Sequence, residues 1–379
     1  MGIIKTLFGQ PSYTISGDRV SAAITVQGGH LTAQFKTKKG EVNPFFVSPW
    51  WKEVMYDVDG VLRVLRGDFF CFPFGGGEDP NMKKTYPVHG YTACENWDFI
   101  HFVEEKGKKE MVLRMELGER DGKVDKVIRI MDGEPVLYID HIVDGFSGRM
   151  PLGYHPTLKL PDRERSGIID ISKPVAGFTP PEPFENPKNG GYSLLKTGVE
   201  ITDMKKVPTI TGGFIDVTRY PTPGGYEDIV MFLSDEKLQF AFSAVSVPGA
   251  GYLYFQLKDP KVLAQTLFWM SNGGRHYPPW NGRVHSVLGV EEVTSFFHYG
   301  IKRSVEKNFF IDRGSRTTLS FDGKTPVHIK LIMGMTAIEK SFKCVAEIIR
   351  KNSSTVTIVG RGGERIDVPC RVDFLFEEG

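Results

Sequence analysis

The sequence predicts an all-β protein, a large antiparallel β-sandwich followed by a small C-terminal α+β extension. Short runs of apolar, β-branched and aromatic residues recur along the chain, separated by turn signals such as "KKG", "RDGK" and "DGEP". The 42 glycines and 24 prolines favour many turns over long helices. The predicted strands do not alternate with helices, so a parallel sheet is not expected. The expected strands include residues 20–26, 31–37, 97–104, 110–117, 126–130, 136–144, 152–160, 229–233, 240–245, 252–257, 266–270 and 287–297.

Two units are expected along the chain. Residues 1–314 contain the regular series of strands and form the sandwich domain. Residues 315–379 are expected to form an extension of one helix, over 336–351, and a hairpin, over 356–369, that packs on the sandwich. The apolar face of the expected helix consists of Ile338, Phe342, Val345 and Ile349.

Composition excludes several classes of function. With 47 basic and 46 acidic residues the net charge is +1, so neither nucleic acid nor an anionic membrane surface is an expected partner. No apolar run approaches the ~20 residues of a membrane span. The four cysteines form no CxxC pair and are read as free thiols in a reducing compartment. We therefore expect a cytoplasmic monomer or homodimer.

Two of the nine histidines occupy unusual positions. His155 interrupts the alternating strand "LGYHPTLKLP" directly before Pro156, a residue that cannot donate to a β-ladder. His89 lies at the end of a Gly/Pro-rich loop and just before a strand, where functional side chains often collect. The alternative for both is an imidazole that only hydrogen-bonds the loop backbone.

The apolar strand "LGVEEVTSFF" contains two adjacent carboxylates, Glu291 and Glu292. Consecutive residues on a strand point to opposite faces, so one of them is expected to point into the sandwich or its cleft. A buried carboxylate needs a partner or a function, and the second one would need a Lys or Arg. The alternative is an edge strand with both groups in solvent.

The loop "WMSNGGRHYPPWNGRVH", residues 269–285, mixes flat apolar rings with hydrogen-bonding groups, which suits a polyhydroxylated ligand such as a sugar. Trp269, Arg275 and Trp280 are the candidate ligand-binding residues. A surface loop held by its own aromatic residues is an equally weighted alternative. His276 and His285 lack a third spaced ligand, so no metal site is predicted.

Three segments in this order resemble the aldose 1-epimerase (galactose mutarotase-like) superfamily. The segment "RGDFFCFPFGGG…HGYTACENW" is similar to the first motif of hexose-phosphate mutarotases, "GYHPTLKL" to the strand with the second histidine, and "LGVEEVTSFF" to the strand with the glutamate. The resemblance covers about residues 15–300. After His89-Gly90 the pattern has Phe-Ala-Arg where this chain has Tyr-Thr-Ala, which argues against a phosphorylated sugar.

The resemblance implies a galactose mutarotase-like supersandwich with a cleft, and an enzyme that interconverts the anomers of a sugar. It implies that His155 is the general acid that protonates the ring oxygen and that Glu291 is the general base at the anomeric hydroxyl. His89 and Arg66 would bind sugar hydroxyls. No metal and no organic cofactor is required.

Two other functions remain open on the sequence. One is a non-catalytic carbohydrate-binding protein with the same fold. The other is a carbohydrate-cleaving enzyme, which ranks lower because glycosidases usually use two carboxylates at a defined separation.

Overall fold

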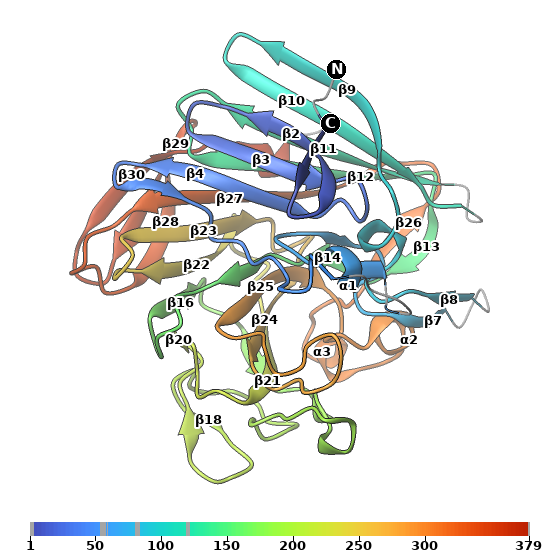
Figure 1. The fold of residues 1–379 in the computed structure, drawn as a ribbon, viewed down its shortest axis with the longest axis vertical. Coiled ribbons are helices and arrows are strands. Elements are labelled where there is room, and N and C mark those ends of the chain that lie inside the picture. The colour runs from blue at the N-terminus through green and yellow to red at the C-terminus, as the bar shows by residue number, and fades with distance from the viewer. Residues whose placement is uncertain (1–3, 54–57, 59, 80–83, 119–121, 378–379) are drawn as a thin grey trace.

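The computed structural model describes residues 4–53, 58, 60–79, 84–118 and 122–377. All paired strands in this part of the chain are antiparallel, which confirms the predicted all-β fold. The largest sheet has nine strands, and Figure 1 shows it running through the molecule. In spatial order its strands are β20 (Arg219–Tyr220), β16 (Gly167–Ile171), β22 (Ala241–Val247), β23 (Tyr252–Lys258), β27 (Val327–Ala337), β12 (Val136–Asp144), β11 (Lys123–Met131), β10 (Lys108–Glu116) and β9 (Asp98–Glu105).

Two further sheets face the nine-stranded sheet. The seven-stranded sheet is joined to it by hydrogen bonds from Ser243 to Glu292 and from Gln256 to Val290 O. The five-stranded sheet contacts β27 and β10 (Figure 1). The seven-stranded sheet contains β17 (Ala176–Phe178), β21 (Tyr226–Leu233), β24 (Gln265–Asn272), β25 (Val287–Thr294), β14 (Leu152–Tyr154), β15 (Thr157–Lys159) and β6 (Phe70–Cys71). The five-stranded sheet contains β1 (Ile4–Leu7), β2 (Gln10–Ser16), β3 (Val20–Thr25), β4 (Leu31–Thr37) and β5 (Gly40–Val42).

The remaining elements are short. Three pairs of strands are β7 (Gly77–Asp79) with β8 (Lys84–Tyr86), β13 (Ser147–Met150) with β26 (Leu319–Asp322), and β18 (Val207–Pro208) with β19 (Phe214–Ile215). The helices are α1 (Gly60–Val64), α2 (Gly300–Val305) and α3 (Phe309–Asp312), with 3₁₀ turns η1 (Tyr91–Ala93), η2 (Pro187–Asn189) and η3 (Val372–Phe376). Among the described residues, no helix has the length and apolar character that crossing a membrane requires.

The central strands of the nine-stranded sheet are buried on both faces, so they read as continuous apolar runs. On β12, Leu137 and Ile139 join the core between the large sheets. Val136 and Tyr138, which alternate with them, join a second core on the opposite face. That second core is covered by the three-stranded sheet β28 (Val345–Asn352), β29 (Thr355–Gly360) and β30 (Arg365–Pro369), at the left of Figure 1.

The predicted helix over 336–351 is wrong, whereas the predicted hairpin is confirmed by β29 and β30. The segment instead holds the end of β27, a turn, and β28. Ile338, Phe342 and Val345 are buried as the helical spacing suggested, but in the second core. A register shift in β28 between Val345 and Glu347 places Val345 and Ile348 on the same side at a spacing of three, which imitates helical periodicity.

The division of the chain at residue 315 stays a prediction, but strand pairing favours a later boundary. β27 follows residue 315 and yet lies between β12 and β23, paired with both. Of the later elements, β28–β30 form a sheet of their own, and β26 pairs with β13. A separate C-terminal unit would therefore begin at about β28.

Candidate active site

A cavity of about 380 Å³ brings together six of the seven predicted site residues. Its walls come from α1, from the segments that flank β6, from β21, β24 and β25, and from the loop after β24. A volume at the lower end of the range for ligand pockets accommodates one small molecule. The predicted residues that line it are His89, His155, Trp269, Arg275, Trp280 and Glu291.

The break in the strand at His155 is confirmed. β14 ends at Tyr154 and β15 begins at Thr157, and both pair with β25. Between them, the backbone N–H of His155 donates to Phe69 O (3.0 Å) and to Asp68 Oδ1 (3.1 Å) instead of to a ladder partner. The imidazole stacks on the ring of Phe69 at 4.4 Å between centroids. The interruption therefore turns the side chain of His155 into the cavity.

His155 and Glu291 are in direct contact inside the cavity. Nε2 of His155 lies 3.2 Å from Oε1 of Glu291, and both side chains are buried. The Thr157 hydroxyl donates to His155 O, so the Nδ1–H of His155 donates to Thr157 Oγ1 in turn (3.1 Å). The neutral imidazole therefore carries its hydrogen on Nδ1, and the lone pair of Nε2 faces the carboxyl group of Glu291.

Burial favours the uncharged form of both partners. It holds the pKa of His155 well below the ordinary imidazole value, with the neighbouring His89 acting in the same direction. Burial also holds the pKa of Glu291 well above the ordinary carboxyl range. The resting pair is thus a protonated carboxyl group beside a neutral imidazole and carries one exchangeable proton, although Glu291 Oε1 makes no hydrogen bond with Nε2 in this arrangement.

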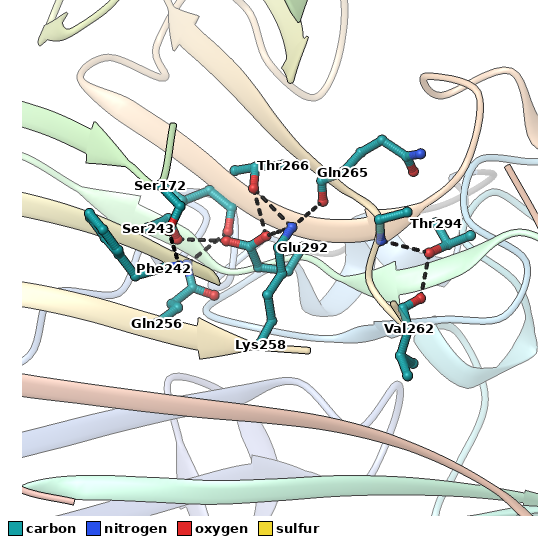
Figure 2. A network of polar contacts seen from close by, with 12 residues as sticks. Ser172, Phe242, Ser243, Gln256, Lys258, Val262, Gln265, Thr266, Glu292 and Thr294 are labelled. Carbon is teal, nitrogen blue, oxygen red and sulfur yellow. Dashed lines mark hydrogen bonds and ion pairs between the residues drawn. The ribbon is translucent and has the colours of Figure 1, made fainter. Parts of the chain in front are cut away.

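Glu292 points to the opposite face of β25, as the period of two requires. Its carboxylate accepts hydrogen bonds from Ser243 (2.6 Å) and Thr266 (2.8 Å) and pairs with Lys258 Nζ at 2.5 Å. Lys258 also donates to Gln265 O (2.7 Å). Figure 2 shows these groups converging from β22, β23 and β24. Lys258 is thus the Lys or Arg partner that the sequence predicted for the second glutamate. The network joins the two large sheets on the side of β25 that faces away from the cavity.

Arg275 lies within a group of aromatic rings in the cavity wall. Its guanidinium carbon is 4.5 Å from the centre of the Trp280 ring and 5.5 Å from that of Trp269. Its Nε donates to Glu185 Oε1 at 2.6 Å. The Trp269 indole donates to Glu227 (3.1 Å), whose pKa burial raises to about 7. The loop's aromatic residues thus both hold the loop and line the cavity, and sugar binding by this loop stays a prediction.

His89 presents one ring nitrogen to the protein. Its Nδ1 accepts from Gly75 N at 3.4 Å and lies 3.3 Å from Cys71 Sγ, so the hydrogen of the neutral ring is on Nε2. Burial lowers the pKa of His89 to about 3, which keeps the ring neutral. Its ring centre lies 5.0 Å from that of His155. His89 is therefore placed beside the acid–base pair as a neutral hydrogen-bond donor.

Arg66 is the predicted site residue that the structure does not bring to the cavity. Its buried guanidinium donates to the carbonyl groups of Val64 (3.0 Å), Leu7 (3.0 Å) and Phe8 (3.1 Å). The motif placed it close to the site in sequence, but its side chain turns back to hold the N-terminal hairpin. We therefore assign Arg66 a structural role.

His298 also lines the cavity, although it was not among the predicted site residues. Burial lowers its pKa to about 4, and its Nδ1 has no hydrogen-bond partner among the described residues. It follows β25 in an irregular segment, where no periodicity predicts which way the side chain points. The cavity residues Val61, Leu62 and Leu65 were also missed, because a short apolar run predicts burial and not which surface it covers. No group of three or more potential metal ligands occurs among the described residues.

Solved structures with a similar fold include galactose mutarotase-like proteins. The chain superposes on a candidate aldose 1-epimerase from Escherichia coli K12 with a TM-score of 0.56 and 12% identity, over 86% of this chain and 99% of that one. A galactose mutarotase-like protein of Clostridium acetobutylicum gives 0.57 and 12%, over 89% and 99%. A galactose mutarotase related enzyme of Lactobacillus acidophilus gives 0.54 and 9%, over 88% and 100%. No protein-family model and no curated protein matches the chain. The resemblance seen in the sequence is confirmed at the level of the fold.

Proposed function

We propose that the protein is an enzyme of the aldose 1-epimerase type, which interconverts the anomers of a sugar by opening and closing its ring. The observation that carries the proposal is the contact between His155 and Glu291, a proton donor and a proton acceptor 3.2 Å apart in a cavity of suitable size. Opening a cyclic hemiacetal requires one proton to leave O1 and one to reach O5. A pair that shares one proton supplies both functions.

The reaction begins with transfer of the shared proton from Glu291 Oε1 to His155 Nε2. The Glu291 carboxylate then removes the proton from O1 of the sugar. The O1 electron pair forms the carbonyl bond to C1, the C1–O5 bond breaks, and O5 takes the proton from Nε2. The products are an open-chain aldehyde, a neutral imidazole and a protonated carboxyl group, so the pair again has its resting protonation.

Rotation about the C1–C2 bond presents the other face of the aldehyde, and the reverse transfers close the ring to the other anomer. The Nδ1–H bond to Thr157 keeps the His155 ring in one orientation throughout. His89 donates from Nε2 to a sugar hydroxyl, and Trp269 and Trp280 cover the apolar face of the ring. Arg275 donates to a further sugar oxygen. Positioned acid–base groups of this kind contribute roughly 10²–10⁴-fold to rate.

Glycoside cleavage is less well supported, because Glu292 faces away from the cavity and is occupied by Lys258. The proposal is tested by saturation-transfer NMR between the two anomeric protons, with a panel of hexoses, pentoses and uronic acids. We expect faster anomer exchange for at least one sugar. Binding without any acceleration would indicate a carbohydrate-binding protein instead.

A further inference from the structure

The wall of the cavity has few polar groups. Of the 19 described residues that line it, nine have hydrocarbon side chains, two are tryptophans with one N–H each, two are glycines, and six carry a polar group at the end of the side chain; the Trp269 N–H is already bonded to Glu227. Two of these six, His155 and Glu291, exchange protons with O5 and O1 in the proposed reaction. A hexopyranose has four further hydroxyl groups, each with one donor and two acceptor positions. The remaining polar residues are His89, Arg275, Tyr277 and His298.

Contacts link the remaining groups to one another. His89 is next to His155, with ring centres 5.0 Å apart. The Phe184 ring lies between Arg275 and His298, 5.2 Å from the guanidinium carbon and 5.0 Å from the His298 ring centre. Tyr277 shares Glu185 with Arg275 and accordingly is also part of this group.

Part of the cavity wall is apolar among the described residues. Val61, Leu62 and Leu65, from α1 and the residue after it, form this part. None of these side chains can form a hydrogen bond. A hydroxyl group buried against them would lose its water without gaining a partner, and this is unfavourable.

The cavity also offers no free positive charge. The one cation in its wall, Arg275, is paired with Glu185 at 2.6 Å, and the carboxyl group of Glu227 acts on it as well. The three histidines are neutral near pH 7, since burial lowers the pKa to about 3 for His89 and about 4 for His298, and well below the ordinary value for His155. A phosphate or carboxylate group on the sugar would find no unpaired cation among the described residues.

We infer that the site takes a neutral, deoxygenated aldose, a hexose that lacks a hydroxyl group on the edge facing Val61, Leu62 and Leu65. This inference rests on the proposed function, because it takes the position of C1 from His155 and Glu291. The sugar's oxygen-rich edge faces the polar group around Arg275, and its methyl or methylene edge faces the apolar wall. A 6-deoxyhexose is one member of this class, and 3-deoxy and 4-deoxyhexoses are others.

The test compares matched pairs of sugars that differ by one hydroxyl group. Anomer exchange is measured by saturation-transfer NMR for D-glucose and D-galactose, for their 3-, 4- and 6-deoxy analogues, and for their 6-phosphates and uronic acids. We expect kcat/KM for at least one deoxy analogue to exceed that of its parent by about tenfold or more. We also expect every charged derivative to be slower than its parent. A parent hexose equal to or faster than all of its deoxy analogues would overturn the inference while leaving the proposed function intact.

Binding affinity separates failure of the inference from failure of the proposed function. If no sugar shows faster exchange, isothermal titration of the same panel still measures the preference. A deoxy analogue that binds more tightly than its parent would support the inference in a non-catalytic protein. Tighter binding of the parent, or no binding of any sugar in the panel, would overturn it.

Two variants test whether Val61 is responsible for the preference for a deoxy sugar. Val61→Thr adds a hydroxyl group with little change of volume, and Val61→Ala removes methyl groups without adding one. We expect Val61→Thr to reduce the ratio of kcat/KM for the deoxy sugar to kcat/KM for its parent several-fold. With Val61→Ala, the deoxy sugar should remain the preferred substrate. A ratio unaffected by Val61→Thr would contradict the assignment of the apolar edge to this wall.

Discussion

The buried ion pair between Lys258 and Glu292 allows a quantitative test of how β25 is held. Lys258→Met removes the cation and keeps the volume of the side chain, but it leaves the Glu292 carboxylate in a site from which water is excluded. Breaking one partner of a buried pair costs about 3–5 kcal/mol. For 379 residues the entropy of unfolding is about 0.8 kcal/mol/K, so the melting temperature should fall by about 4–6 °C.

The double variant Lys258→Met/Glu292→Leu removes both charges. It leaves the hydroxyl groups of Ser243 and Thr266 without the carboxylate, but no buried charge remains. We expect it to recover at least half of the loss, which is about 2 kcal/mol. Thermal melts followed by circular dichroism measure both variants. A Lys258→Met protein as stable as wild type, or single and double variants with equal losses, would refute this reasoning.

Three further predictions concern pH, Arg66 and the C-terminal strands. Catalysis requires one proton on the pair of His155 and Glu291. The value of kcat/KM should therefore fall at acid pH when the His155 imidazole becomes protonated, below the ordinary imidazole pKa, and at alkaline pH when Glu291 loses its proton, above the ordinary carboxyl range. A fall governed by a carboxyl group with an ordinary pKa near 4 would contradict this. Arg66→Met should cost about 2 kcal/mol or more of stability and leave sugar affinity unchanged, and a selective loss of affinity would restore its predicted binding role. Ending the chain after residue 343 should uncover the core around Tyr138 and Phe255 and cause aggregation in light scattering, and a monodisperse truncated protein with the wild-type melting temperature would argue against that.

Strand positions could be predicted from the sequence because alternation and turns are local signals. The interval 136–144 matches β12 residue for residue, and the break at His155 follows from Pro156 alone. The separation of Glu291 from Glu292 follows from the period of two. The helix over 336–351 failed because the register shifts of β28 depend on its partner strand, which no local pattern reveals.

The candidate site was predictable only where a residue type was unusual for its position. His155 and Glu291 stood out because polar groups interrupted apolar strands. Arg66 was misplaced because a motif gives the path of the backbone and not the direction of a long side chain. His298 and the apolar wall at Val61 lie in segments whose place is set by tertiary packing, so the local sequence contained no signal for either.

The adjacent glutamates provide the most direct test of the central claim, that the proton shared by His155 and Glu291 drives anomer exchange. Glu291→Gln keeps the size of the side chain but removes the exchangeable proton, and Glu292→Gln makes the same change one residue later on the opposite face. By saturation-transfer NMR on an accepted sugar, the account predicts that Glu291→Gln lowers kcat by a factor on the order of 10² or more with sugar binding largely intact. Glu292→Gln should lower the melting temperature and retain turnover per folded molecule. Normal turnover in Glu291→Gln, with or without loss in Glu292→Gln, would contradict the account.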